Sequence, residues 1–240
     1  MSGSGFHTTH WSVIQRTTAS DAEVRGEALR DLCEAYWYPL YAYLRRLGRD
    51  ADRAGDIVQG LFVKLLEKDG LSRVTEEGGT FRQWLITCLR NHERDVLEHE
   101  GALRRGGGVQ TFSIDVEEGE RRYGAEPSNG ADPEASFERA WARQVLDNAL
   151  EILKGEYQAG GRGPVFDQLQ GALKTDHEEL DREQVGQALG LSPVAVRVAL
   201  HRLRERYRSA ILGEVRSTLG DGVDPGEELR SLLLALEGGS

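Results

Sequence analysis

Hydrophobic residues recur every three or four positions through most of this chain. Residues 27–48 place apolar side chains on one stripe of a helix, and Gly48 provides a stop. Pro39 falls inside that stripe and predicts a kink or a break. The stripe consists of Leu29, Leu32, Tyr36, Leu40, Tyr43 and Leu47.

Two more helices are predicted before residue 106. One begins near Asp50 and runs through "DADRAGDIVQGLFVKLLEK"; the other is "FRQWLITCLRNHERDVLEHEGAL", with Thr80 as its N-cap. Helical periodicity returns after residue 133 and continues to about Val215. No alternating pattern is long enough to indicate a strand, so the sequence predicts an all-α fold.

Composition divides the chain into parts. Between Asp115 and Glu134 seven acidic residues face two arginines, a local charge of −5 in a chain of net charge −10. Such an acidic, Gly- and Pro-containing segment is typical of a flexible linker. We therefore expect helical domains at 1–106 and 134–216, a linker at 107–133, and a tail at 217–240 with a short amphipathic helix.

A helix-turn-helix pattern occupies the second domain. Asp181 can cap a first helix, Gly186 permits close helix packing, and Gly190 can adopt the left-handed turn conformation. Leu191 is expected to fill the turn from inside. Ser192 is a good N-cap, and Pro193 suits the first position of the next helix.

The second helix of this pattern carries arginines beside its apolar face. Residues 192–208 hold five arginines and one glutamate, a local charge of +4. Its first residues could reach base edges in a major groove while later arginines neutralise phosphates; a solvated surface helix is the alternative. The predicted DNA-binding residues are Ser192, Val194, Arg197, Val198, His201, Arg202, Arg204 and Arg208.

Two motifs of the first domain make a family resemblance specific. "GDIVQGLFVKLLEK" and "GTFRQWLITCLRNHERD", followed by a linker and a helix-turn-helix, resemble the extracytoplasmic-function sigma factors of bacterial RNA polymerase. The resemblance covers about residues 11–215. Asp56, Gln59 and Phe62 match the D-x-x-Q-x-x-F signature, which implies binding to the β′ clamp of core polymerase. Gly60 departs from the acidic residue frequent at that position, and it weakens the helix by up to about 1 kcal/mol relative to alanine.

The same resemblance assigns the next helix to the minus-10 promoter element. Aromatic and cationic side chains suit a strand of unstacked bases, although Phe81 and Trp84 could equally be core residues. Between Arg90 and Arg105 the charges sum to zero, so this domain is not expected to bind DNA strongly alone. The implied contacts are Phe81, Arg82, Trp84, Arg90, Asn91, Arg94, Arg104 and Arg105, and Leu85 also matches the motif.

The resemblance implies a non-enzymatic protein that directs core polymerase to promoters. Its implied partners are core polymerase (β′ clamp and β flap) and promoter DNA, and no cofactor is expected. The helix-turn-helix would read the minus-35 duplex. The acidic linker suits a basic polymerase channel, or it is a solvated tether. The C-terminal leucines predict a helix that packs on the second domain or docks a regulator such as an anti-sigma factor.

Two other functions compete with this interpretation. A stand-alone helix-turn-helix regulator would bind DNA tightly without polymerase. A metal-dependent enzyme would use His92, Glu93, Glu98 and His99, but the histidines are two helical turns apart, about 10 Å along the axis.

The sequence also bears on the compartment. Cys33 and Cys88 show no paired or ligand-like spacing, which favours a reducing environment. The N-terminus lacks the blocks of a signal peptide, and the longest apolar run, Leu232 to Leu236, is too short to span a bilayer. We expect a soluble cytoplasmic protein with no membrane partner.

Overall fold

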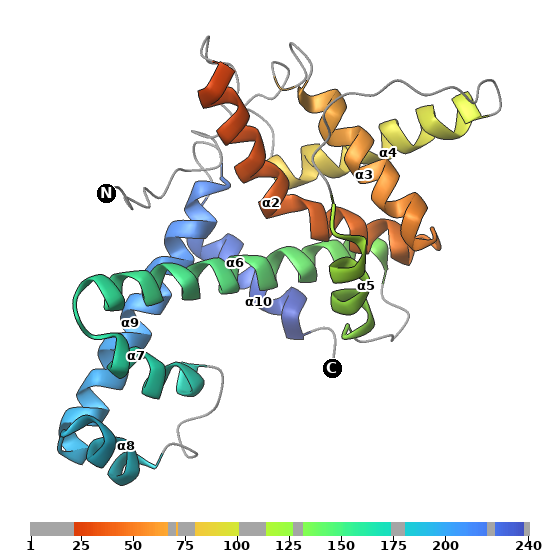
Figure 1. Cartoon of the computed structure of the whole chain (residues 1–240). Coiled ribbons are helices and arrows are strands. Elements are labelled where there is room, and N and C mark those ends of the chain that lie inside the picture. Colours follow the sequence, from red (N-terminus) through yellow and green to blue (C-terminus); the bar gives the residue numbers. More distant parts are fainter. Residues whose placement is uncertain are drawn as a thin grey trace. The chain divides into compact units, whose positions relative to one another are not determined.

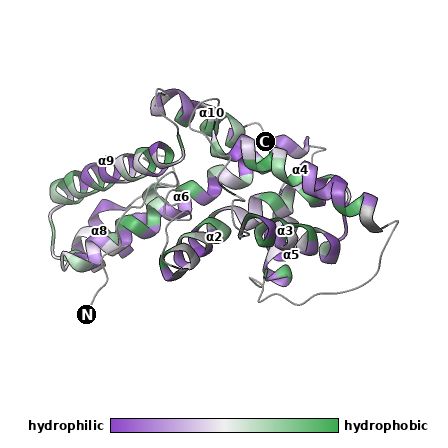
Figure 2. Cartoon of the chain, turned by 90° about the horizontal axis from the view of Figure 1, so that it is seen from above, coloured by the Kyte–Doolittle hydropathy of each residue, from purple (hydrophilic) through white to green (hydrophobic). Residues whose placement is uncertain are grey.

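The computed structural model describes residues 22–66, 71, 80–100, 114–126, 132–173, 181–219 and 224–237 (Figure 1). Every secondary-structure element in these ranges is helical, which confirms the all-α prediction. Figure 2 shows hydrophobic and hydrophilic residues mixed along the helices, as expected when one face of each is buried. The elements are α2 (Ala22–Arg46), α3 (Ala51–Leu66), α4 (Phe81–Glu100), α5 (Val116–Gly124), α6 (Pro133–Ala159), α7 (Gly163–Leu169), the 3₁₀-helix η1 (Gln170–Leu173), α8 (Arg182–Leu189), α9 (Pro193–Ser217) and α10 (Pro225–Glu237).

The chain forms two compact units. The first unit takes its described residues from 8–144 and 215–240, and the second unit is Val145–Glu214. Helix α6 is divided between them, with residues 133–144 in the first unit and 145–159 in the second. The expected start of a second domain at residue 134 therefore differs from the division in the structure by about eleven residues.

The first unit is built on α2, α3 and α4. Helix α2 contacts α3, and α3 contacts α4. Pro39 does not break α2, which continues to Arg46, and Figure 1 shows the helix changing direction along its length. Asp50 starts α3, because its Oδ1 accepts the Arg53 backbone N–H at 2.8 Å. The predicted Thr80 cap takes another form, since the Gln83 side chain accepts from the Thr80 N–H at 3.4 Å.

Part of the expected linker is an ordered helix that packs on the first unit. Asp115 caps α5 by accepting the Glu118 N–H at 2.9 Å. Helix α5 contacts α2 and α3 at two glycines. A Cβ at Gly55 would lie 3.0 Å from Val116, and a Cβ at Gly119 would lie 3.1 Å from the Tyr41 ring. The acidic, Gly- and Pro-containing composition predicted a flexible tether. It does not reveal that two glycines let α5 pack closely against α2 and α3.

The second unit has its own hydrophobic core. Leu153, Tyr157, Phe166, Val185 and other buried residues from α6 to α9 form one cluster. Val196, Leu200 and Leu203 contribute from α9, as the apolar stripe predicts. This core holds the helix-turn-helix.

The C-terminal helix α10 packs within the first unit, where it meets α4 of the predicted first domain and the part of α6 that was predicted to belong to the second domain. Arg139 Nε donates to the Ala235 carbonyl at 3.3 Å, and Arg82 pairs with Glu228. Leu232 is buried, whereas Leu233 of the same leucine run is 45% exposed. The sequence pattern predicted the leucine stripe but carried no information about the surface that receives it.

Candidate nucleic-acid interface

The turn between α8 and α9 forms as the glycine spacing predicts. Asp181 Oδ1 accepts the Glu183 and Gln184 N–H groups, each at 3.0 Å, and caps α8. Gly190 ends α8 in the left-handed region, with φ 65°. The Leu191 carbonyl oxygen lies 2.6 Å from where a Cβ at Gly186 would be, so only glycine fits there without a shift. The two helices are therefore held in a helix-turn-helix arrangement.

Helix α9 begins at this turn and presents a mixed apolar and basic face. Ser192 Oγ accepts the Ala195 N–H at 3.2 Å, which confirms its capping role. Val194, Arg197, Val198 and His201, at helical spacings of three and four, are all exposed. Arg202 and Arg208 are exposed as well. The outward side of this half of α9 is therefore exposed.

Two predictions about this motif change. Leu191 is 36% exposed instead of filling the turn, because its backbone carbonyl occupies the inside against Gly186. Arg204 is half-buried and donates to the Ala172 carbonyl at 2.8 Å. That bond ties α9 to the end of η1 and argues for a positioning role.

A hollow of about 430 Å³ lies beside the exposed face of α9. Three arginines and a histidine contribute to its walls. Arg182, at the start of α8, is a cation that sequence reasoning missed; its position at the N-terminus of the first helix of a helix-turn-helix was the available signal. The lining residues are Arg182, Arg197, Val198, Leu200, His201 and Arg204.

The residues of the D-x-x-Q-x-x-F signature differ in exposure along α3. Asp56 is exposed, Gln59 is half-buried, and Phe62 is buried. Asp56 lines a second hollow, of about 300 Å³, together with Asp50 and Asp52. Asp56 is therefore accessible on the surface of α3, whereas Phe62 packs within its own unit.

Gly60 has a local structural explanation. A Cβ at this position would lie 2.8 Å from Nε2 of His92 on α4. Burial lowers the pKa of His92, and the positive charge of Lys64 lowers it further. The imidazole thus packs on the glycine in the middle of the signature, where an acidic side chain would have to displace it.

The aromatic residues at the start of α4 belong largely to the core. Phe81 is 1% exposed, and its ring stacks on that of Trp84 with centroids 5.5 Å apart. The centroids of the Phe81 and Tyr36 rings are 5.3 Å apart, in an edge-on arrangement. Trp84 is half-buried. This geometry favours the core role for Phe81 and leaves part of Trp84 accessible.

Arg82 is enclosed within the first unit. It is 4% exposed, its Nε donates to both carboxylate oxygens of Glu138 at 2.8 and 3.0 Å, and it pairs with Glu228. Its guanidinium also lies 4.6 Å from the centroid of the Trp141 ring. This placement argues against the predicted DNA contact, because two carboxylates already neutralise the cation out of reach of solvent.

The other cations predicted on α4 have different surroundings. Arg90 is exposed but pairs with Glu134 of α6, and its Nε donates to the Tyr43 hydroxyl at 2.8 Å. Asn91 and Arg94 are exposed, and a guanidinium nitrogen of Arg94 donates to Asn91 Oδ1 at 3.5 Å. Arg104 and Arg105 lie outside the described residues. α4 therefore offers less positive surface than its arginine count suggests.

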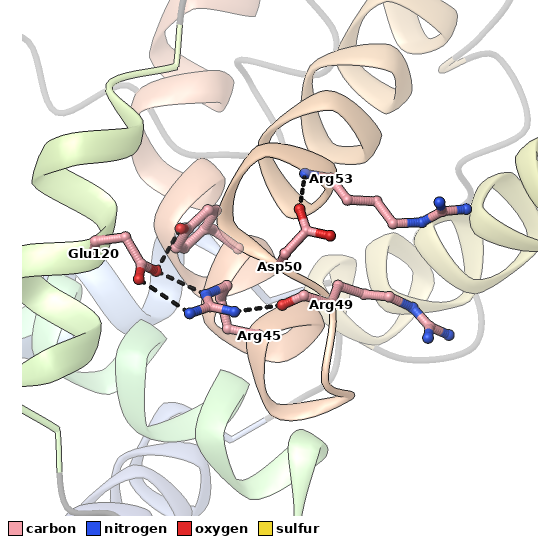
Figure 3. A network of polar contacts seen from close by, with 6 residues as sticks. Arg45, Arg49, Asp50, Arg53 and Glu120 are labelled. Carbon is pink, nitrogen blue, oxygen red and sulfur yellow. Dashed lines mark hydrogen bonds and ion pairs between the residues drawn. The ribbon is translucent and has the colours of Figure 1, made fainter.

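A polar network fastens α5 to α2 (Figure 3). Glu120 accepts from Arg45 Nε at 2.7 Å and from the Tyr41 hydroxyl at 2.6 Å, while Arg45 also donates to the Arg49 carbonyl. The hydrogen bond from Arg45 lowers the pKa of Glu120, and burial with the bond to Glu120 raises the pKa of Tyr41. Glu120 is therefore one of several carboxylates of the acidic segment with a partner inside the protein, since Glu126 accepts from the Tyr38 hydroxyl and Glu134 pairs with Arg90.

Two of the candidate metal residues, His92 and Glu93, are engaged elsewhere in the structure. Glu93 pairs with Arg49 at 2.5 Å, His92 packs on Gly60, and the side chain of His99 lies outside the described residues. Within the described ranges, no three His, Cys, Asp or Glu side chains are grouped to hold a metal ion. The same ranges contain no helix that is both long and apolar enough to cross a membrane.

Comparison with known proteins finds distant relatives with consistent names. The chain is 26% identical over 189 residues to the RNA polymerase sigma factor CarQ of Myxococcus xanthus, covering 79% of this chain and 91% of that one. It is 26% identical to the ECF RNA polymerase sigma factor ShbA of Streptomyces griseus, covering 82% and 93%. It is 24% identical to the ECF RNA polymerase sigma factor SigE of Mycolicibacterium smegmatis, covering 70% and 56%. No family model and no solved structure matches the chain.

Proposed function

We propose that this chain binds core RNA polymerase and directs it to promoters. The proposal is supported by its relatives, which are named as RNA polymerase sigma factors, two of them as ECF sigma factors. The observation that carries the proposal is the pairing of two features in one chain. A helix-turn-helix with an exposed basic face lies in the second unit, and the D-x-x-Q-x-x-F helix lies in the first. As a sigma factor the protein would act in the cytoplasm and catalyse no reaction of its own.

The two units would divide the work. Exposed Asp56 and half-buried Gln59 on α3 would contact the β′ clamp of the polymerase, with Phe62 holding the helix in place. The exposed face of α9 would read the minus-35 duplex through Val194, Arg197, Val198 and His201, with Arg202 and Arg208 on phosphates.

The role proposed for α4 is narrower than the sequence predicts. Trp84, Asn91 and Arg94 remain accessible for the minus-10 element. Phe81 would position Trp84 by stacking, and Arg82 would fix the helix to α6 and α10. Since few cations of α4 are open, the polymerase would have to supply much of the attraction for melted DNA.

The acidic segment would have two parts with different roles. Glu120 anchors α5, so reversing its charge would detach the helix as well as alter any contact with a polymerase channel. Glu117 is exposed, so reversing its charge should alter a contact with the channel without detaching α5. Glu117→Lys should change abortive and full-length transcript yields only if the segment faces a basic channel.

Reconstitution tests the main proposal. The full chain is mixed with bacterial core polymerase, and run-off transcription is measured on a fragment library. Asp56→Ala should reduce core binding, while Arg197→Ala should leave it intact and reduce promoter selection. If the chain neither joins core nor stimulates specific initiation, the proposal is wrong. Tight operator binding without core would instead support a stand-alone regulator.

A further inference from the structure

The exposed apolar residues of the second unit gather at the start of α9. Val194 is 63% exposed, Val198 is 40% exposed and Leu191 is 36% exposed. Within the described part of this unit, these are all of the large hydrophobic side chains that are exposed. Single exposed hydrophobic residues need no explanation, but three around one turn form a local apolar surface.

The two valines share one face with an arginine and a histidine. Val194, Arg197, Val198 and His201 follow the spacing i, i+3, i+4 and i+7, so they are neighbours on the exposed side of α9. The opposite side holds the buried Val196, Leu200 and Leu203. The core therefore fixes which side of α9 faces outward, and the valines are not spare core residues.

A cationic hollow borders this apolar surface. Val198 lines it next to Arg197, with Arg182 from α8 and His201 from α9 on its other walls. A ligand that binds both the apolar surface and the arginine-lined hollow must present apolar groups beside negative charge. The major groove of DNA does so, since the thymine 5-methyl group is its apolar feature and phosphates flank the groove.

We propose that Val194 and Val198 recognise thymine methyl groups in the minus-35 element, while Arg182 binds a phosphate of the adjoining strand at the edge of the hollow. This inference rests on the proposed function and adds the base that the helix selects. The valines are four residues apart, about 6 Å along the helix axis, which corresponds to about two base-pair steps. The thymines they meet therefore lie within about two steps of each other, on either strand.

Replacing thymine by uracil tests this contact directly, because uracil lacks only the 5-methyl group. The holoenzyme first selects its minus-35 element from a random duplex library, and deoxyuridine then replaces each thymine singly. Wild-type binding should fall about threefold to tenfold at one or two positions that lie within about two base-pair steps of each other. Val194→Ala or Val198→Ala should remove the penalty at its own position, and Val194→Thr, which keeps a methyl group, should retain most of it.

Three controls separate the outcomes. Leu233→Ala, an exposed leucine on α10, should leave every uracil penalty unchanged. Arg182→Ala should weaken binding equally for thymine and uracil duplexes and reduce the salt dependence of binding. A selected element without thymine, tolerance of uracil at every position, or equal penalties in wild type and both alanine variants would overturn the inference. If core polymerase is not bound at all, the proposed function fails, and the same scan on the full chain by itself still decides the methyl contact.

Discussion

Arginines occur on both α4 and α9, but the two helices use them differently. On α4, Arg82 is buried between Glu138 and Glu228, and Arg90 pairs with Glu134. On α9, Arg197, Arg202 and Arg208 are exposed beside a hollow or on open surface. The number of arginines on a helix therefore does not measure how well the helix can bind DNA, because acidic residues distant in sequence can form ion pairs with the same arginines.

Removing Arg82 should produce the largest effect on stability. Arg82→Ala leaves the carboxylates of Glu138 and Glu228 without their cation, and losing one partner of a buried ion pair costs about 3 kcal/mol. Denaturant unfolding of the full chain measures this loss. Arg94→Ala, an exposed arginine of the same helix, should stay within about 0.5 kcal/mol of wild type. Equal stability of both variants would mean that the Arg82 cluster is not structural.

Removing Arg197 should show the opposite pattern. Arg197→Ala should weaken promoter binding by the holoenzyme about tenfold, since an arginine contact in the major groove contributes about 1 to 3 kcal/mol. Its exposure predicts almost no change in unfolding free energy. Filter binding and denaturation on the same preparations compare the two effects. Loss of core binding in this variant would assign α9 a different role.

The packing of His92 on Gly60 predicts a coupled pair. Gly60→Ala gains helix propensity of about 1 kcal/mol, but its Cβ must push the His92 ring, which lies 2.8 Å away. We expect Gly60→Ala to stabilise the His92→Ala background more than it stabilises wild type. A double-mutant cycle of unfolding free energies measures the difference, and strict additivity would contradict the contact.

His92 also predicts a pH dependence. Its lowered pKa means that, below about pH 6.5, the unfolded chain binds a proton that the folded chain does not. Stability should therefore fall as the pH drops below that value, and His92→Ala should reduce the slope. Unfolding at pH 5.5 and 7.5 measures both variants.

The smallest effect concerns the anchor of α5. Glu120→Gln removes the ion pair with Arg45, but the Glu120 side chain is 40% exposed, so the cost should be at most about 0.5 kcal/mol. The lowered pKa of Glu120 means that this stabilisation is present above its ordinary value of 4.5 and is lost as the pH falls through the lowered value. Hydrogen exchange of the α5 amides reports the docking.

A neighbouring arginine provides the control for α5. Arg121→Ala removes a side chain that is 78% exposed and whose ion pair with Glu118 lies within the helix. It should leave exchange at α5 close to wild type. Faster exchange in Arg121→Ala than in Glu120→Gln would show that the contact with Arg45 does not hold the helix.

Local sequence signals were sufficient where the structure depends on neighbours in the chain. The caps at Asp181 and Ser192, the left-handed Gly190 and the buried stripe of α9 were predicted correctly, because capping, turn geometry and helical period act over a few residues. The exposed face of α9 followed from that stripe. Most of the proposed minus-35 contacts therefore follow from the sequence of this motif.

Tertiary structure decided which charged residues remain available. The acids that bind Arg82 come from α6 and α10, 56 and 146 positions away, and Glu120 reaches Arg45 from 75 positions away. The sequence placed Glu120 in a tether, Glu138 in a second domain and Glu228 in a tail. Composition shows where a charge lies in the chain but not which residue it pairs with. The sequence by itself determined the helices and the reading face, because these depend on local periodicity. Only the fold determined that Arg82 is structural and that α5 and α10 belong to the first unit, because burial and ion pairing depend on residues distant in the chain.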